Sequence, residues 1–288
     1  MVEQAKNNKN FRAVSEYYFT VTKRWWAATW YLKFAVFVVG ITAMLFPSIS
    51  IYMTILVGAF SFASEFSSIQ SNNNKGIAEG FLRKLDLRNS FGWEISNLEI
   101  ADAFDYLSKN AKAQLALTDQ PDGYFASGET AGWMRAMHNL QESAWWSKHL
   151  AKSMGRYCFA LTIFLAVVSI LILIFSLMLT STVEQQVSFA EQIRNINRIV
   201  IALLLLIISF GLIPLIINYY SFSGKAERSE RLATELLKSD SDNTVQAIKA
   251  FNEYHLARSS APLIPTWLWK KKNDTLNEGW KQFVSDQR

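Results

Sequence analysis

Two uninterrupted apolar stretches, residues 157–180 and 199–220, dominate the hydrophobic pattern of this chain. Neither contains Lys, Arg, Asp, Glu or His, and each is long enough as an α-helix to cross a hydrocarbon core of about 30 Å. A third apolar stretch, residues 34–63, is too long for one span and has Pro47 near its middle. Because proline ends or bends a helix, this stretch predicts a helical hairpin. Its two spans are expected at residues 26–46 and 48–69.

The pattern therefore predicts an all-α membrane protein with four transmembrane helices arranged as two hairpins. The polar remainder is large enough for a helical domain made by the insert between spans two and three together with the C-terminal tail. The expected divisions are an N-terminal helical arm (1–25), the first hairpin (26–69), the insert (70–156), the second hairpin (157–220) and the tail (221–288).

The N-terminal arm carries Phe11, Val14 and Tyr18 at steps of three and four residues, which is typical of an amphipathic helix. We expect this helix to run straight into the first span. A separate helix lying on the membrane surface is the alternative.

Breaks and helices are also expected in the polar segments. The run Ser71-Asn72-Asn73-Asn74-Lys75-Gly76 predicts a turn. Helices should follow at 77–87, 97–118 and 129–154, and the last should join the third span as one rod. Pro214 is expected to kink the fourth span near its inner end. In helix 129–154, apolar residues at steps of roughly 3.5 predict a packing seam: Trp133, Met137, Leu140, Ala144, Ala151 and Met154.

Lys and Arg residues gather in the arm, the insert and the tail, whereas the links between paired spans carry no net positive charge. By the positive-inside rule, both termini and the insert should face the cytoplasm. The single cysteine, Cys158, can form no internal disulfide, which fits a reducing compartment. The same bias explains the net charge of +5 and the pI near 9.2, so no DNA or RNA polymer is expected as a partner.

Motifs for catalysis are not found. The chain has no His-Glu-x-x-His, no Gly-rich phosphate loop, no Cys-x-x-Cys and no Gly-x-Ser-x-Gly. The sequence therefore predicts no catalytic residue, metal site or cofactor, and a membrane-embedded enzyme is the least favoured class. The deep parts of the predicted spans also lack ionisable residues, which argues against a proton-coupled transporter.

Hydroxyl side chains recur on one side of two spans. They favour either of two interpretations: a weakly polar wall that lines a pore when several copies assemble, or close helix–helix packing through small, hydrogen-bonding residues. The candidate pore-lining residues are Thr54, Ser61, Thr162, Ser169 and Ser176.

The segment 124–154 combines groups that could bind a ligand, because Arg and Asn can hold a phosphate or a base edge and aromatic rings offer a stacking surface. The alternative is structural: contacts of Arg135 with Glu142 or Asn139 would tie the helix to its neighbours, and Trp145 would anchor at the membrane interface. The candidate ligand-binding residues are Tyr124, Arg135, His138, Asn139, Glu142, Trp145 and Lys148.

Near the C-terminus, Trp267 and Trp269 precede Lys270, Lys271 and Lys272. This basic, aromatic patch could contact anionic lipid headgroups, form part of a ligand site, or simply be solvated.

Two segments carry a resemblance to a known family: the arm Tyr17-Tyr18-Phe19 with Lys23-Arg24, and the run from Tyr124-Phe125-Ala126-Ser127 to Asn139-Leu140-Gln141-Glu142-Ser143-Ala144-Trp145-Trp146-Ser147-Lys148. Together with the layout of arm, hairpin, insert, hairpin and tail, they resemble the SMODS-associating four-transmembrane effector family of bacterial antiphage defence.

The resemblance implies a multi-pass protein of the bacterial inner membrane that is encoded beside a nucleotidyltransferase. Such a protein would respond to a cyclic nucleotide or oligonucleotide, form a homo-oligomer in the lipid bilayer and breach the membrane. The alternative function is a membrane scaffold or accessory subunit that forms no pore and recruits a cytoplasmic partner.

Overall fold

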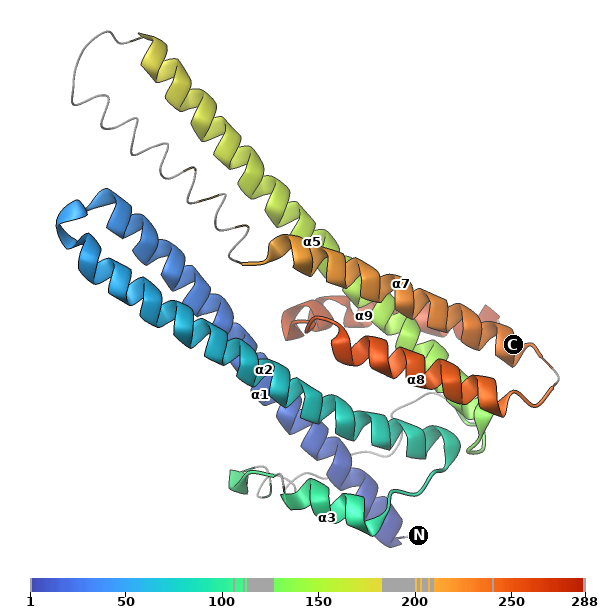
Figure 1. Ribbon diagram of the computed structural model, residues 1–288. Helices are drawn as coiled ribbons and strands as arrows, with labels where there is room; N and C mark the ends of the chain where they lie inside the picture. The colour runs from blue at the N-terminus through green and yellow to red at the C-terminus, as the bar shows by residue number, and fades with distance from the viewer. Residues whose placement is uncertain are drawn as a thin grey trace. The chain divides into compact units, whose positions relative to one another are not determined.

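The computed structural model describes residues 2–105, 107–110, 112, 127–182, 200, 203, 207, 210–239 and 241–286, and no strand occurs among them. Three helices are long: α1 (Val2–Leu45), α2 (Ser50–Phe91) and α5 (Trp133–Thr182). Four are shorter: α3 (Asn97–Asp105), α7 (Leu212–Leu237), α8 (Thr244–Ser260) and α9 (Thr266–Asp286) (Figure 1). The prediction of an all-helical protein is confirmed for this part of the chain.

Helices α1 and α2 form the predicted hairpin and run antiparallel beside one another (Figure 1). A single 3-10 turn, Pro47–Ile49, joins them, as expected from the missing N–H and fixed φ of Pro47. Helix α1 is unbroken from the arm into the first apolar stretch, which confirms that the arm and the first span are one helix.

In the part of the chain that the structure describes, three helical segments are long and apolar enough to cross a membrane: Phe11–Leu45, Ser50–Phe91 and Trp133–Phe175. Their apolar side chains are widely exposed; Phe62 is 78% exposed and Phe164 is 62% exposed. Exposed apolar side chains in such numbers are unfavourable in water but favourable among lipid tails. These helices indicate a membrane protein. The fourth predicted span, at 199–220, lies largely outside the described residues.

The chain forms two compact units. Unit 1 comprises Met1–Lys23, Asn72–Lys152 and Tyr219–Arg288, and unit 2 comprises Arg24–Ser71 and Ser153–Asn218. The N-terminal arm thus belongs to the same unit as most of the insert and the tail. Helices α1, α2 and α5 each contribute residues to both units. At a rise of about 1.5 Å per residue, α2 and α5 are each roughly twice as long as a bilayer core requires.

Unit 1 has a core rich in alanine where α5, α7 and α8 pack together. Small side chains let helix backbones approach closely, so the larger rings and chains can fill the remaining space. Met137, Leu140 and Ala144 of the predicted seam lie in this core, which confirms that this face of the helix packs against other helices. The buried members are Ala136, Met137, Leu140, Ala144, Ala226, Ala233, Leu236, Ala247, Ala250, Phe251 and Tyr254.

A second core joins α1 to the end of α2. The predicted apolar face of the arm supplies Phe11, Val14 and Tyr18, each less than 7% exposed. Phe11 packs against Phe81 with ring centroids 5.5 Å apart. The remaining buried members are Ala78, Leu82, Leu85 and Leu107.

The turn predicted at residues 71–76 is wrong, because α2 continues through this segment to Phe91. Asn and Gly have weak helix propensity, but packing holds the helix here. Ser71 is 5% exposed and Ala78 is fully buried, and Ser15 of α1 donates a hydrogen bond of 2.9 Å to the Ala78 carbonyl. The separate helix predicted at 77–87 is therefore the last part of α2.

Helix α2 ends at a glycine. Gly92 has a φ of 74° and its N–H donates to the Arg88 carbonyl at 2.9 Å. This left-handed conformation is the usual helix C-cap and favours glycine.

The single helix predicted at 97–118 is also wrong in part. Helix α3 ends at Asp105, and Leu107 and Ser108 are not helical. Leu107 is 6% exposed and packs in the second core, so its burial against α1 and α2 outweighs helix continuation. Residues 113–118 lie outside the described part.

Helix α5 spans 50 residues without interruption, which confirms the predicted rod, although it starts at Trp133 rather than at residue 129. The predicted bend at Pro214 takes the form of a break. Gly211 has a φ of 63°, α7 starts at Leu212, and Pro214 lies in its first turn, where the missing N–H costs no helical hydrogen bond.

Candidate functional site

Unit 1 contains a cavity of about 750 Å³, a size typical of small-molecule sites (roughly 300–1,000 Å³). Its wall is formed by α1, α2, α5, α7, α8, α9 and residues 261–264. Helices α1, α2 and α5 also contain the three candidate membrane spans. Three of the helices that line the cavity therefore also contain candidate membrane spans.

Charged side chains line this cavity, with one more cation than anions. Arg12 Nε lies 3.0 Å from Glu16 Oε1, and Arg258 Nε lies 3.3 Å from Glu79 Oε2. Among the described residues no ion pair holds Lys23, and burial lowers the pKa of its ammonium. An anion bound beside this partly desolvated lysine would favour its charged form. The charged residues of the wall are Arg12, Lys23, Lys75 and Arg258, with Glu16, Glu79 and Glu142.

Aromatic rings make up a second part of the wall. They come from five helices, α1, α5, α7, α8 and α9. Phe222 and Tyr254 are buried, whereas Phe19, Trp146 and Trp269 offer faces on which a planar group can stack or a cation can rest. The rings are Phe19, Trp146, Phe222, Tyr254 and Trp269. Cations beside aromatic faces suit a ligand that carries both a phosphate or carboxylate and a flat ring.

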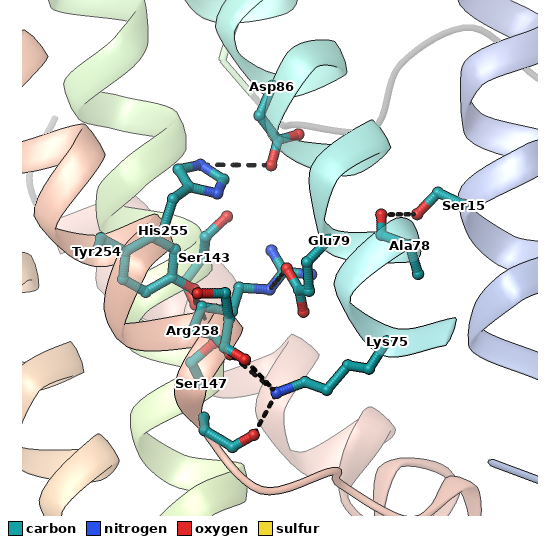
Figure 2. Close-up of polar contacts among 12 residues, drawn as sticks. Ser15, Lys75, Ala78, Glu79, Asp86, Ser143, Ser147, Tyr254, His255 and Arg258 are labelled. Carbon is teal, nitrogen blue, oxygen red and sulfur yellow. Dashed lines mark hydrogen bonds and ion pairs between the residues drawn. The ribbon is translucent and has the colours of Figure 1, made fainter. Parts of the chain in front are cut away.

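Polar contacts between α2 and α8 position one side of the cavity (Figure 2). Lys75 Nζ donates to the carbonyls of Arg258 at 3.3 Å, Ser259 at 2.8 Å and Ala261. These are the last carbonyls of α8 and the residue after it, which have no partner within the helix. A cation at a helix C-terminus is also favoured by the helix dipole. Lys75 therefore caps α8, and burial lowers the pKa of its ammonium.

Farther along the same face of α2, Asp86 Oδ2 lies 3.7 Å from His255 Nε2, and both side chains are 3% exposed (Figure 2). Burial raises the pKa of Asp86 to about 7, opposed by Arg258 and reinforced by Glu79. Burial, together with Arg258 and Arg83, lowers the pKa of His255 to about 3. At neutral pH the imidazole is therefore uncharged, and the carboxyl group is close to half protonated.

Tyr254 joins α8 to α5 at the cavity wall. Its hydroxyl donates to the Ser143 carbonyl at 2.9 Å and lies 2.8 Å from Ser147 Oγ, while its ring is 1% exposed. The three residues appear together in Figure 2. Since α5 continues into unit 2, this contact connects the cavity wall to one of the candidate spans.

Replacing Lys75 with Met is expected to lower the free energy of unfolding of unit 1 by about 1–3 kcal/mol, because the α8 carbonyls lose charge-assisted hydrogen bonds. Hydrogen exchange should speed up at the end of α8 and in residues 261–265. The control is Lys225→Met, since Lys225 is exposed on α7. Equal exchange in both variants would contradict the capping role.

Glu142 of the predicted ligand-binding residues lines the cavity. The other described ones lie elsewhere. Asn139 is 1% exposed and donates to Ser90 Oγ at 3.0 Å. Lys148 forms an ion pair with Glu230 at 2.5 Å. Trp145 packs on Trp280 with centroids 5.5 Å apart.

Arg135 and His138 are half-buried on α5 and do not line the cavity. Burial lowers the pKa of His138, while Glu129 opposes the shift. Tyr124 lies outside the described residues. Within the described residues, no group of three or more His, Cys, Asp or Glu could hold a metal ion.

Three of the predicted pore-lining residues donate their hydroxyls to the backbone of their own helix. Thr54 donates to Ser50, Thr162 to Cys158 and Ser169 to Leu165, each to the carbonyl four residues earlier at 2.8–2.9 Å. Such bonds let a hydroxyl face lipid or a neighbouring helix at small cost. Thr54 and Ser61 are exposed, whereas Ser169 is 1% exposed. The side chain of Ser176 lies outside the described part.

Sequence reasoning missed the polar face of α2 and its partners on α8. Lys75, Glu79 and Asp86 recur at helical spacing, a signal that was hidden by the turn predicted at residues 71–76. His255 and Arg258 share one face of α8 at a three-residue step, but nothing in the sequence indicates that they meet α2.

Comparisons of the chain with protein-family models, with curated proteins and with solved structures find no match.

Proposed function

We propose that this protein is an effector of bacterial antiphage defence in the inner membrane, which senses a cytoplasmic signal, forms a homo-oligomer and permeabilises the membrane. One observation carries the proposal: three of the helices that line the cavity, α1, α2 and α5, are also the helices with candidate membrane spans. A ligand in the cavity would therefore touch elements that continue directly into the bilayer.

The wall chemistry supports a nucleotide as the signal. Lys23 and Arg12 would bind phosphate oxygens, because charge-assisted hydrogen bonds are the strongest kind available in such a site. Trp146 and Trp269 would stack with a base. A cyclic nucleotide or a short oligonucleotide presents both groups and matches the resemblance in the arm and in residues 124–148.

The proposed mechanism is a population shift. A ligand changes a conformational equilibrium only by as much as it binds one state better than the other. Binding between α1, α2 and α8 would favour the arrangement of helices that packs against further copies. In the assembly, the exposed hydroxyls of Thr54 and Ser61 would face a shared path.

The test uses purified protein in liposomes loaded with a potential-sensitive dye. Cyclic dinucleotides and cyclic oligonucleotides are expected to depolarise protein-containing liposomes and to leave empty liposomes polarised. In cells, co-expression with a nucleotidyltransferase should collapse the membrane potential before growth stops. A stable complex with a soluble partner and no conductance under any ligand would contradict the pore and favour the scaffold.

A further inference from the structure

The start of α9 presents a basic, aromatic surface, of which Trp267, Lys270, Lys271 and Lys272 lie outside the cavity wall. Trp267 and Trp269 are 49% and 47% exposed, and Lys270 and Lys271 are exposed beside them. Leu268, between the two tryptophans, is fully buried and fixes this turn of α9 to unit 1. Two large rings are thus held in a defined place on the surface.

Helix α5 extends this surface. Trp145 of α5 packs on Trp280 of α9, which holds the two helices together. Burial lowers the pKa of His149, and the charges of Lys148, Lys152 and Lys272 add to this shift. Lysines from α5 and α9 therefore raise the same local positive potential, and a negatively charged partner would relieve it.

The chain places this surface next to the membrane boundary. Lys152 is exposed on α5, five residues before the predicted third span, which is about 7.5 Å along a helix. Tyr219, at the end of the predicted fourth span, donates to the Leu263 carbonyl at 2.6 Å, four residues before Trp267. Two separate segments thus connect the start of α9 to span ends.

We propose that Trp267, Lys152, Lys270, Lys271 and Lys272 form a membrane-contact surface that binds the phosphate groups of anionic phospholipids. Tryptophan prefers the headgroup level of a bilayer, and lysines beside it attract anionic lipid. The occupant is the surface of the membrane that the spans cross. The inference rests on membrane insertion and is independent of the proposed effector function.

The test titrates full-length protein in a zwitterionic detergent with phosphatidylglycerol and counts retained lipids by native mass spectrometry. The variant Lys270→Gln/Lys271→Gln/Lys272→Gln is expected to bind phosphatidylglycerol roughly 100-fold more weakly. The arginine variant Lys270→Arg/Lys271→Arg/Lys272→Arg should keep the affinity. Phosphatidylcholine and soluble glycerol phosphate should compete poorly in every case.

The matched control is Lys238→Gln/Lys249→Gln/Lys281→Gln, which removes the same charge from exposed positions on α9 and outside it. Equal losses in the two glutamine variants would overturn the proposal, since only net charge would then matter. Saturation by glycerol phosphate at the same concentration as lipid would also overturn it, in favour of a free phosphate ligand. Thermal unfolding without lipid identifies a variant that fails to fold. If the glutamine variant fails to fold, the arginine variant decides: retained affinity supports the proposal, and lost affinity in a folded arginine variant overturns it.

Discussion

Replacing Asp86 with Asn is expected to stabilise unit 1 above pH 7 by roughly 2 kcal/mol and to make it sensitive to acid. The folded pKa of Asp86, about 7, is above its ordinary value of 3.8. Its contribution to stability is therefore complete below about pH 4 and is lost as the pH rises through 7. Asparagine is uncharged at every pH, so the variant avoids the cost of burying a carboxylate.

His255 acts in the opposite direction. Its folded pKa, about 3, is below the ordinary value of 6.5, so its contribution is complete above 6.5 and is lost as the pH falls through 3. In the wild type the two slopes oppose each other between about pH 4 and 6.5. In Asp86→Asn only the slope of His255 remains, so the free energy of unfolding should decrease steadily as the pH is lowered from 6.5 to 4.

Thermal unfolding in detergent from pH 4 to 9, followed by tryptophan fluorescence, measures both effects. The matched control is Asp102→Asn, because Asp102 is exposed on α3 and its replacement changes the same charge. A plot of unfolding temperature against pH for Asp102→Asn should run parallel to the wild-type plot. The plot for Asp86→Asn should cross the wild-type plot. Parallel curves for both variants would show that Asp86 is ionised in the folded state.

Reversing the charge of Lys23 is expected to shift the ligand response to much higher ligand concentration. Among the described residues Lys23 forms no ion pair and, unlike Lys75, is not engaged by the α8 carbonyls; its partial burial strengthens its attraction for an anion. The loss of one charge-assisted hydrogen bond and the added repulsion should weaken nucleotide binding by about 100-fold in Lys23→Glu. Dye-loaded liposomes with a nucleotide titration give the shift directly.

Two further variants separate binding from folding. Lys23→Arg keeps the cation and should retain most of the response, whereas Lys225→Glu reverses a charge at an exposed position and should leave the response unchanged. The amount of each variant in the membrane fraction is measured in parallel. A normal dose response in inserted Lys23→Glu would remove this residue from the site.

Three of the predicted spans, as candidates, and the α1–α2 hairpin could be predicted because their signal is local. A run of apolar residues of the right length, and a proline between two such runs, decide the outcome within a few turns of helix. The turn predicted at residues 71–76 failed for the opposite reason. Local propensity favoured a break there, but Ala78, Lys75 and Ser71 gain contacts with distant segments that outweigh it.

The cavity could not be predicted, because its wall joins positions far apart in the chain. Arg12, Lys75 and Arg258 reach one cavity only after α1, α2 and α8 have packed. The predicted ligand-binding residues were chosen from one stretch of the chain, residues 124–154, and among the described ones the structure places Glu142 at the cavity. The buried meeting of Asp86 with His255 likewise has no signature in spacing, since 168 positions separate them.

The discontinuous make-up of unit 1 sets the order in which the protein can be assembled. Its parts are the first residues of the chain, the stretch between the hairpins and the last residues, and the cap that Lys75 provides needs carbonyls that are synthesised more than 180 positions later. Unit 1 can therefore be completed only after the last residues of the chain have been synthesised. A truncated product would therefore lack a finished cavity wall.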